Sequence, residues 1–291
     1  MSQQDDVQFE KGLSPLGVWG LALGAMIGWG CFVMPGDTLL PKAGPIGASI
    51  GLALGALMII IISFSYSYLI GKYPVAGGSF IYTDTAFGKT HAFLCGWFIA
   101  IAYWALIPMN ATAVGLVARY IFPGPLQTMP LYEIAGWTVY GGELIVDILA
   151  IIIIGIVNMR GVEAAGWFQT AVALGLVGCI LVIGAVILAG GVDWGNLQPY
   201  FAPEKTTMAS IFTVTALAPW AYVGFDCIPQ ASEEYAFSNK KTKALLVSSI
   251  SVAALMYMIM NIATAVVAPW EQYIIDNKAW PTGAAIESLV G

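Results

Sequence analysis

Charged residues are scarce in this sequence of 291 residues, where Asp, Glu, Lys and Arg together make up only 10%. Hydrophobic residues make up 59%, and the mean hydropathy is +0.81, which is more apolar surface than a soluble core can bury. The net charge is -6, and no basic patch suggests a nucleic-acid partner. The composition therefore excludes an ordinary soluble domain and indicates a protein that lies in a lipid bilayer.

The residues of common enzyme and metal sites are also missing. The chain has one histidine, and its four cysteines, Cys31, Cys95, Cys179 and Cys227, form no CxxC pair. It shows no phosphate-binding loop and no recognisable catalytic triad, so we expect no enzyme, no cofactor and no metal. The first 14 residues are net acidic and unlike the positive leader of a signal peptide. We expect a cytoplasmic tail over 1–14 and a transmembrane domain over 15–291.

Long apolar runs recur along the chain. A helix needs about 20 apolar residues to cross a hydrocarbon layer of roughly 30 Å. Lys and Arg favour the connections that would lie with the N-terminus, which predicts a cytoplasmic N-terminus. The segment after Pro74 suits an amphipathic helix on that face, and the segment after Pro281 is expected to begin an eighth span that the chain does not complete. Seven spans are predicted, at 16–36, 46–70, 92–118, 137–157, 166–190, 207–232 and 244–268.

The first span contains four glycines. Gly20 and Gly24 have the four-residue spacing of close helix packing, and a part in a break of the helix is the alternative. Gly28 and Gly30 flank a single residue at mid-span, and each weakens a helix by about 1 kcal/mol relative to Ala. An unwound backbone survives in a bilayer only where it faces protein or a polar cavity. We therefore predict a break over Ile27–Gly30.

The sixth span carries a matching set of helix-breaking residues. Pro219, Gly224, Asp226 and Pro229 fall within eleven residues of one hydrophobic stretch. Such a set predicts a discontinuous helix, and paired broken helices mark the mid-membrane site of a transporter. The amides that open the second half of span one could hold a carboxylate, and the carbonyls that end the first halves could hold an ammonium group. This pattern suits a zwitterion such as an amino acid.

Four segments together resemble the amino acid/polyamine/organocation permeases: GAMIGWGCFVMPG, YPVAGGSFIYTDTAFG, NMRGVEAAG and WAYVGFDCIPQASEE. The resemblance extends from about Leu13 to the end of the chain. It implies an all-α membrane protein with a five-plus-five inverted repeat and discontinuous helices 1 and 6. The first repeat would cover about 15–192, and an incomplete second repeat would begin over 207–291.

The resemblance also implies roles for individual residues. Trp220 would be the gate over the substrate, and the mostly uncharged pocket favours a neutral amino acid. Leu176 stands near the position where some members carry a lysine in place of a sodium ion, so the coupling ion, proton or sodium, stays open. The substrate-binding set is Ile27, Gly28, Trp29, Gly30, Trp220, Ala221, Val223 and Gly224, and the side-chain pocket is Ala102, Tyr103, Ile107 and Asn110.

Several alternatives remain open from the sequence. Asp226 is either a proton-coupling group or a protonated carboxyl that caps frayed backbone. Trp220 could be core packing, and Asn110 an interhelical hydrogen-bonding group. Glu233 and Glu234 lie close to Lys240 and Lys241 in the sequence and suggest an ion-pair cluster or gate.

The expected function is a secondary active permease or exchanger in the plasma membrane, which moves a small-molecule substrate, an amino acid, by alternating access. A transporter of polyamines or other organic cations is an alternative. A seven-helix receptor is opposed by the cytoplasmic N-terminus and by the two breaks. The oligomeric state is not predicted.

Overall fold

The computed structural model describes residues 11–122, 124–134, 137–190 and 192–290, which form two compact units. The first unit is Met1–Gly78 with Gly166–Gly291, and the second is Ser79–Ala165. The first unit contains the elements α1 (Pro15–Met26), α2 (Trp29–Met34), η1 (Pro35–Leu39), α3 (Leu40–Lys72), most of α7 (Val162–Ala189), η2 (Trp194–Leu197), α8 (Thr207–Ala221), α9 (Cys227–Gln230), η3 (Ser232–Glu234), η4 (Asn239–Lys241), α10 (Thr242–Val266), α11 (Trp270–Asp276) and α12 (Pro281–Val290).

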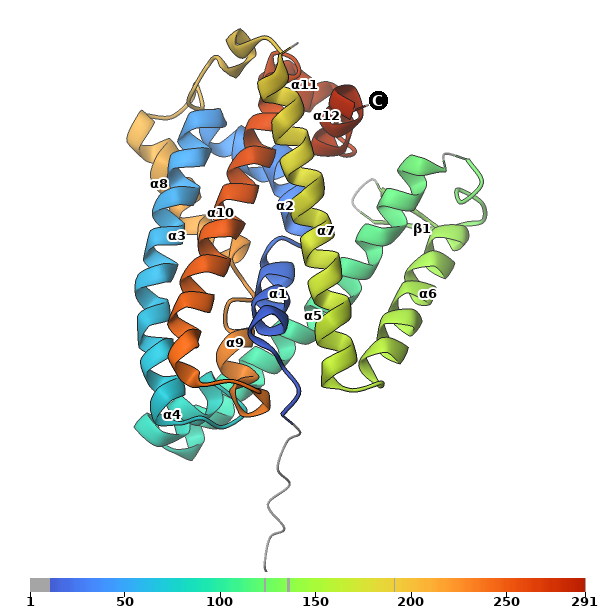
Figure 1. The fold of residues 1–291 in the computed structure, drawn as a ribbon. Helices are drawn as coiled ribbons and strands as arrows, with labels where there is room; N and C mark the ends of the chain where they lie inside the picture. Colours follow the sequence, from blue (N-terminus) through green and yellow to red (C-terminus); the bar gives the residue numbers. More distant parts are fainter. Residues whose placement is uncertain (1–10, 123, 135–136, 191, 291) are drawn as a thin grey trace, which may run out of the picture. The chain divides into compact units, whose positions relative to one another are not determined.

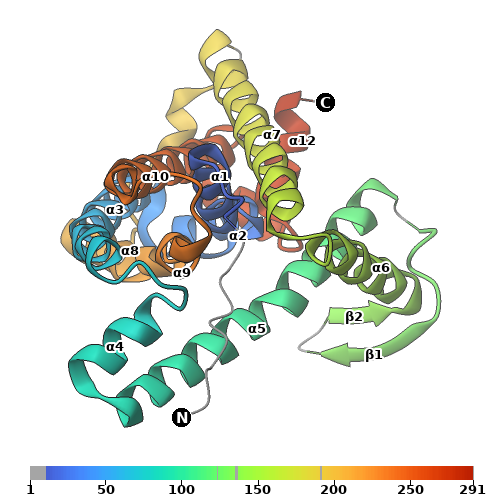
Figure 2. The same ribbon diagram turned by 60° about the horizontal axis from the view of Figure 1, so that its bottom comes forward.

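Helix α3 packs directly against α8 and α10 in the first unit (Figures 1 and 2). The contact with α8 is close because small residues face each other: a Cβ added to Gly55 would lie 2.1 Å from the Ala218 Cβ. Such small-residue contacts are typical of helices that associate in a membrane. On the other side of α3, the Asn261 amide of α10 donates to the Pro45 carbonyl at 2.9 Å. These contacts make α3 the centre of the first unit.

Helix α1 packs against α7 through two of its glycines. A Cβ on Gly20 would lie 2.5 Å from the Thr170 hydroxyl oxygen, and a Cβ on Gly24 would lie 2.3 Å from the Gln169 amide nitrogen. Of the two roles open for these glycines, close helix packing is the one that the structure confirms.

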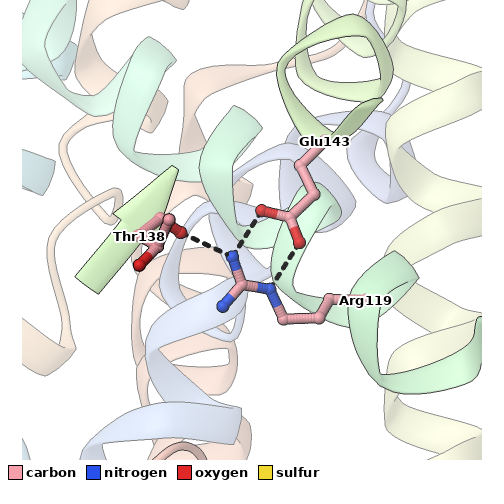
Figure 3. Close-up of polar contacts among 3 residues, drawn as sticks. All are labelled: Arg119, Thr138 and Glu143. Atoms are coloured by element: carbon pink, nitrogen blue, oxygen red, sulfur yellow. Dashed lines mark hydrogen bonds and ion pairs between the residues drawn. The ribbon is translucent and has the colours of Figure 1, made fainter. Parts of the chain in front are cut away.

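The second unit contains α4 (Ser79–Phe87), α5 (Lys89–Ile121), the strands β1 (Pro130–Ile134) and β2 (Trp137–Tyr140), and α6 (Gly141–Asn158). The strands pair antiparallel (Figure 2). Arg119 near the end of α5 forms an ion pair with Glu143 in the first turn of α6 and donates to the Thr138 carbonyl at 2.9 Å (Figure 3). The Arg119 side chain therefore ties the hairpin to both helices.

The expected spans agree with the structure in type and differ at some ends. Within the described residues, five stretches are long and apolar enough to cross a membrane: Pro15–Lys72, Lys89–Ile121, Gly141–Asn158, Glu163–Ala189 and Asn239–Val266; Thr207–Ala221 is a shorter apolar helix. The first stretch holds two expected spans, because the helical chain continues through η1 and then turns sharply at Gly44, whose φ of +69° suits glycine.

The expected start of the fourth span at 137 is wrong. Residues Trp137–Tyr140 form β2, because this aromatic and β-branched run pairs with β1, and the helix begins at Gly141. The discontinuous helix expected within 207–232 is present, since α8 ends at Ala221 and α9 covers Cys227–Gln230. The helix expected after Pro74 is confirmed as α4, Ser79–Phe87.

Candidate functional site

The first span breaks where the glycine spacing predicts. Helix α1 ends at Met26, and the Ile27 N–H still donates to the Leu23 carbonyl at 2.9 Å. Gly28 then leaves the helical conformation with φ -53° and ψ -153°, and α2 begins at Trp29. The first N–H groups of a helix have no acceptor within it, so the amides of Trp29 and Gly30 open α2 as donors. Their direction and the helix dipole favour an anion.

The second break interrupts the sixth span. Helix α8 ends at Ala221, residues 222–226 form turns, and α9 begins at Cys227. Gly224 has a φ of +119°, a backbone conformation that residues other than glycine rarely adopt. A Cβ at this position would lie 2.4 Å from the Ala25 Cβ and 3.2 Å from the Met26 nitrogen. The structure thus brings the second break into contact with the end of α1.

Two tyrosines that the sequence argument did not select lie at this junction. The buried Tyr257 hydroxyl of α10 donates to the Met26 carbonyl at 3.2 Å. A Cβ on Gly30 would lie 2.8 Å from the same hydroxyl oxygen. The Tyr257 ring meets the Tyr222 ring edge-on, with centroids 6.1 Å apart, and the Tyr222 hydroxyl donates to the Leu52 carbonyl at 2.9 Å. The only available signal was a tyrosine in an apolar span, where its hydroxyl must find a partner.

Helix α12 covers the side of α2 and η1, and this too was not foreseen. The Trp280 indole N–H donates to the Phe32 carbonyl at 2.7 Å, and its ring centroid lies 5.1 Å from that of Trp29. The buried Thr282 hydroxyl accepts the Gly36 N–H at 3.1 Å. The side chain of Trp29, a predicted binding residue, therefore packs against the tilted ring of Trp280.

The remaining binding candidates of the second break differ in exposure. Trp220 is 57% exposed in this chain, and its role as a gate stays a prediction. Ala221 is buried, and the Trp220 carbonyl accepts the Val223 N–H at 3.4 Å. Asp226 is partly exposed, and one of its carboxylate oxygens accepts the Gln230 amide at 2.9 Å.

The predicted pocket residues Ala102, Tyr103, Ile107 and Asn110 all lie on α5 in the second unit. The Asn110 amide donates to the Leu106 carbonyl of its own helix at 2.8 Å, which is an intrahelical bond rather than the interhelical one considered above. Their part in a substrate pocket stays a prediction.

On the predicted cytoplasmic side, backbone pairing joins the start of the chain to the segment after α9. The Leu13 N–H donates to the Glu234 carbonyl at 3.1 Å, and the Ala236 N–H donates to the Leu13 carbonyl at 3.0 Å. The Glu233 carboxylate accepts the Ala76 N–H at 3.0 Å. Burial, and then the neighbouring Glu233 carboxylate, raises the pKa of Glu234.

The ion-pair cluster expected between these glutamates and Lys240 or Lys241 is wrong. Across the described ranges, the one recorded ion pair is Arg119–Glu143. For Glu233 the reason is that its carboxylate is engaged by the backbone of the loop after α3, where it accepts the Ala76 N–H.

Comparison with known proteins places this arrangement in a family. A family model described as amino acid permease matches residues 13–291. The chain is 25% identical to the methylthioribose transporter of Bacillus subtilis over 95% of this chain and 59% of that protein. It is 25% identical to cationic amino acid transporter 4 of Mus musculus, over 94% and 43%, and 24% identical to the branched-chain amino acid permease BcaP of Bacillus subtilis, over 87% and 54%.

The chain spans about half the length of the curated relatives it matches. The family match nevertheless covers almost the whole chain and agrees with its apolar helices. The protein therefore belongs to the amino acid permeases of the amino acid/polyamine/organocation superfamily, which are multi-pass membrane transporters and not enzymes.

Proposed function

We propose that this chain carries the head-group site of a secondary active amino acid transporter that works by alternating access. The observation that carries the proposal is the contact of Gly224 with Ala25 and Met26, which sets two broken helices against each other within one unit. Paired breaks of this kind expose backbone donors and acceptors at the depth where a substrate binds.

The backbone at the two breaks offers opposite partners to a zwitterion. The amides of Trp29 and Gly30 at the start of α2 suit the substrate carboxylate. The carbonyls of Ile27, Trp220 and Val223 suit the ammonium group. The Trp220 indole, which is exposed in this chain, would be the gate over the substrate. No basic side chain is required for this recognition.

A neutral amino acid is the substrate that we favour. Asp226 is the one acidic residue in the two breaks, and its carboxylate bonds to Gln230. A polyamine carries at least two ammonium groups and would need further acidic partners. The named relatives transport cationic amino acids, branched-chain amino acids and methylthioribose, so side-chain selection varies among similar chains.

The setting follows from the same reasoning. We infer a cytoplasmic N-terminal tail over 1–14, a plasma-membrane location, and a transmembrane domain over 15–291. A first inverted repeat over about 15–192 and the start of a second over 207–291 would give each repeat one of the broken helices.

The test is a binding assay with a panel of radiolabelled ligands, comprising neutral amino acids, lysine, putrescine and methylthioribose, on the chain in detergent or nanodiscs. We expect neutral amino acids to bind and Gly28→Leu to abolish binding while insertion into the membrane is retained. Binding of putrescine alone, or unchanged amino acid affinity in Gly28→Leu, would refute the proposal.

A further inference from the structure

Four lysines gather where α3 ends and α10 begins. The two helices are antiparallel at this point: the hydroxyls of Ser67 and Thr242 lie 3.5 Å apart, and the Asn239 amide donates to the Ile70 carbonyl at 3.4 Å. These bonds bring the last turn of α3 beside η4 and the first turn of α10. The lysine patch consists of Lys72, Lys240, Lys241 and Lys243, all with exposed side chains.

The lysines of the patch form no ion pair with a carboxylate among the residues that the structure describes. The ion pair found in this part of the chain is Arg119–Glu143, so the four ammonium groups are not engaged in a direct salt bridge. The Lys243 ammonium lies 4.5 Å from the Phe64 ring centroid, and that of Lys72 lies 5.2 Å from the Tyr73 ring centroid. An ammonium group over an aromatic face is attracted to the ring on one side, and its other side can face an anion.

The position of the lysine patch on α3 matches the depth of lipid head groups. Phe64 and Tyr68 are exposed on the last turns of α3, beside the patch, and Leu57 and Ile61 are exposed on the apolar part of the helix before them. Aromatic side chains with a polar edge gather where the hydrocarbon layer meets water. The ammonium groups therefore lie where lipid phosphates would be, at the border of the lipid-facing surface.

We propose that the lysine patch binds the phosphate groups of anionic lipids, such as phosphatidylglycerol. Clustered lysines directly beyond a membrane helix attract anionic lipids, and salt weakens the attraction. Lysine supplies a compact point charge that suits a mobile phosphate. Asn239 also lines a cavity of about 570 Å³, where Lys11 is accompanied by the Glu233 carboxylate, so we do not count Lys11 in the patch.

The sequence offers a matched control for this proposal. Lys42, Lys205 and Lys278 lie toward the opposite ends of α3 and α10, and the Lys205 ammonium donates to the Lys42 carbonyl at 3.1 Å. Replacing these three lysines by Gln changes the net charge as much as Lys240→Gln/Lys241→Gln/Lys243→Gln does. Both sets are exposed, so both variants are expected to fold, which circular dichroism checks.

The experiment is native mass spectrometry of the chain taken from mixed phosphatidylglycerol and phosphatidylcholine nanodiscs. We expect the unaltered chain and the control variant to retain phosphatidylglycerol preferentially, and the lysine-patch variant to lose most of that preference, a fall of several-fold. Added salt should reduce the retention in the unaltered chain. Equal retention in the two triple variants, or no preference in the unaltered chain, would overturn the proposal.

Two further arms identify the source of the anion. Inorganic phosphate that displaces phosphatidylglycerol from the patch at low concentration would show a site for free phosphate instead and would overturn the lipid assignment. Asp5, Asp6 and Glu10 lie outside the described residues. Preferential retention that appears only after these acids are changed to Asn and Gln would show that the tail is the partner of the patch and would equally overturn the proposal.

Discussion

The Tyr257 hydroxyl and the Met26 carbonyl lie 3.2 Å apart, so a residue of α10 satisfies the last carbonyl of α1 at the point where the first span unwinds. An exposed carbonyl at this depth has no water to bond to unless the cavity supplies it. The hydroxyl also fills the space beside Gly30, so it would bound the proposed head-group site on that side. The width of the proposed site is therefore set by a side chain from α10 as well as by the two breaks.

Tyr257→Phe removes this hydroxyl and leaves the ring in place. We expect a loss of stability of about 1 kcal/mol, because the Met26 carbonyl loses its partner, and a several-fold weaker substrate affinity. Thermal unfolding and ligand binding measure the two effects. Tyr68→Phe, at a side chain that is 68% exposed, is the control and should change neither. An unchanged substrate affinity in Tyr257→Phe would show that the Tyr257 hydroxyl does not contribute to the proposed substrate site.

Gly224→Ala tests the contact between the two breaks. The new Cβ would meet the Ala25 Cβ at 2.4 Å, and the φ of +119° is strained for Ala, which together should cost about 1–3 kcal/mol. Substrate binding should fall because the ends of α1 and α8 are pushed apart. The matched control is Gly178→Ala on α7, where a Cβ meets nothing within 4 Å. The same change in unfolding temperature for both variants would contradict the close contact.

Asp226→Asn tests the coupling role considered for the acid in the second break. Asn can still accept the Gln230 amide through its side-chain oxygen, so the local bond is retained while the ionisable group is lost. We expect uptake driven by a pH gradient to fall strongly and substrate binding to persist. The measurement is uptake by the complete permease in proteoliposomes, with and without a proton gradient, and an unaltered pH profile would remove Asp226 from coupling. Glu233→Gln is the control.

The raised pKa of Glu234 leads us to predict that the stability of the folded protein depends on pH. Its pKa in the folded protein is raised by burial and by Glu233, so the folded state holds the proton more tightly than the unfolded chain does. Stability is then greatest below the unfolded pKa and decreases as the pH rises through the folded pKa. Glu234→Gln should raise the unfolding temperature at neutral pH and flatten its dependence between weakly acidic and neutral pH. A steeper dependence in the variant would reverse the sign that we derive.

Arg119→Met tests the ion pair of the second unit. The Glu143 carboxylate would stay in a buried position without its partner, and breaking such a pair costs about 3–5 kcal/mol. The double variant Arg119→Met/Glu143→Met removes both charges and should be closer to the unaltered protein in thermal unfolding. If the double variant is the less stable of the two, then the unpaired charge is not the cause of the loss.

Local sequence was sufficient to predict the two breaks, because glycine and proline act on their own helix. Gly28 and Gly224 fall at the interruptions that the structure contains. The contacts of Tyr257 with Met26 could not be predicted, since they join residues 231 positions apart and depend on how α10 packs. The start of the fourth span was wrongly predicted at 137, where the structure has the strand β2. Hydropathy does not distinguish a short apolar strand from the start of a span.

The absence of a side chain on Gly55 has a mechanical consequence. Where a Cβ would approach the Ala218 Cβ to 2.1 Å, the Gly55 backbone of α3 packs directly against the Ala218 methyl group of α8, with no long side chain between them to change rotamer. A displacement of α3 is then carried to α8 without slack. The second break directly follows α8, so it would move together with α3 and α8.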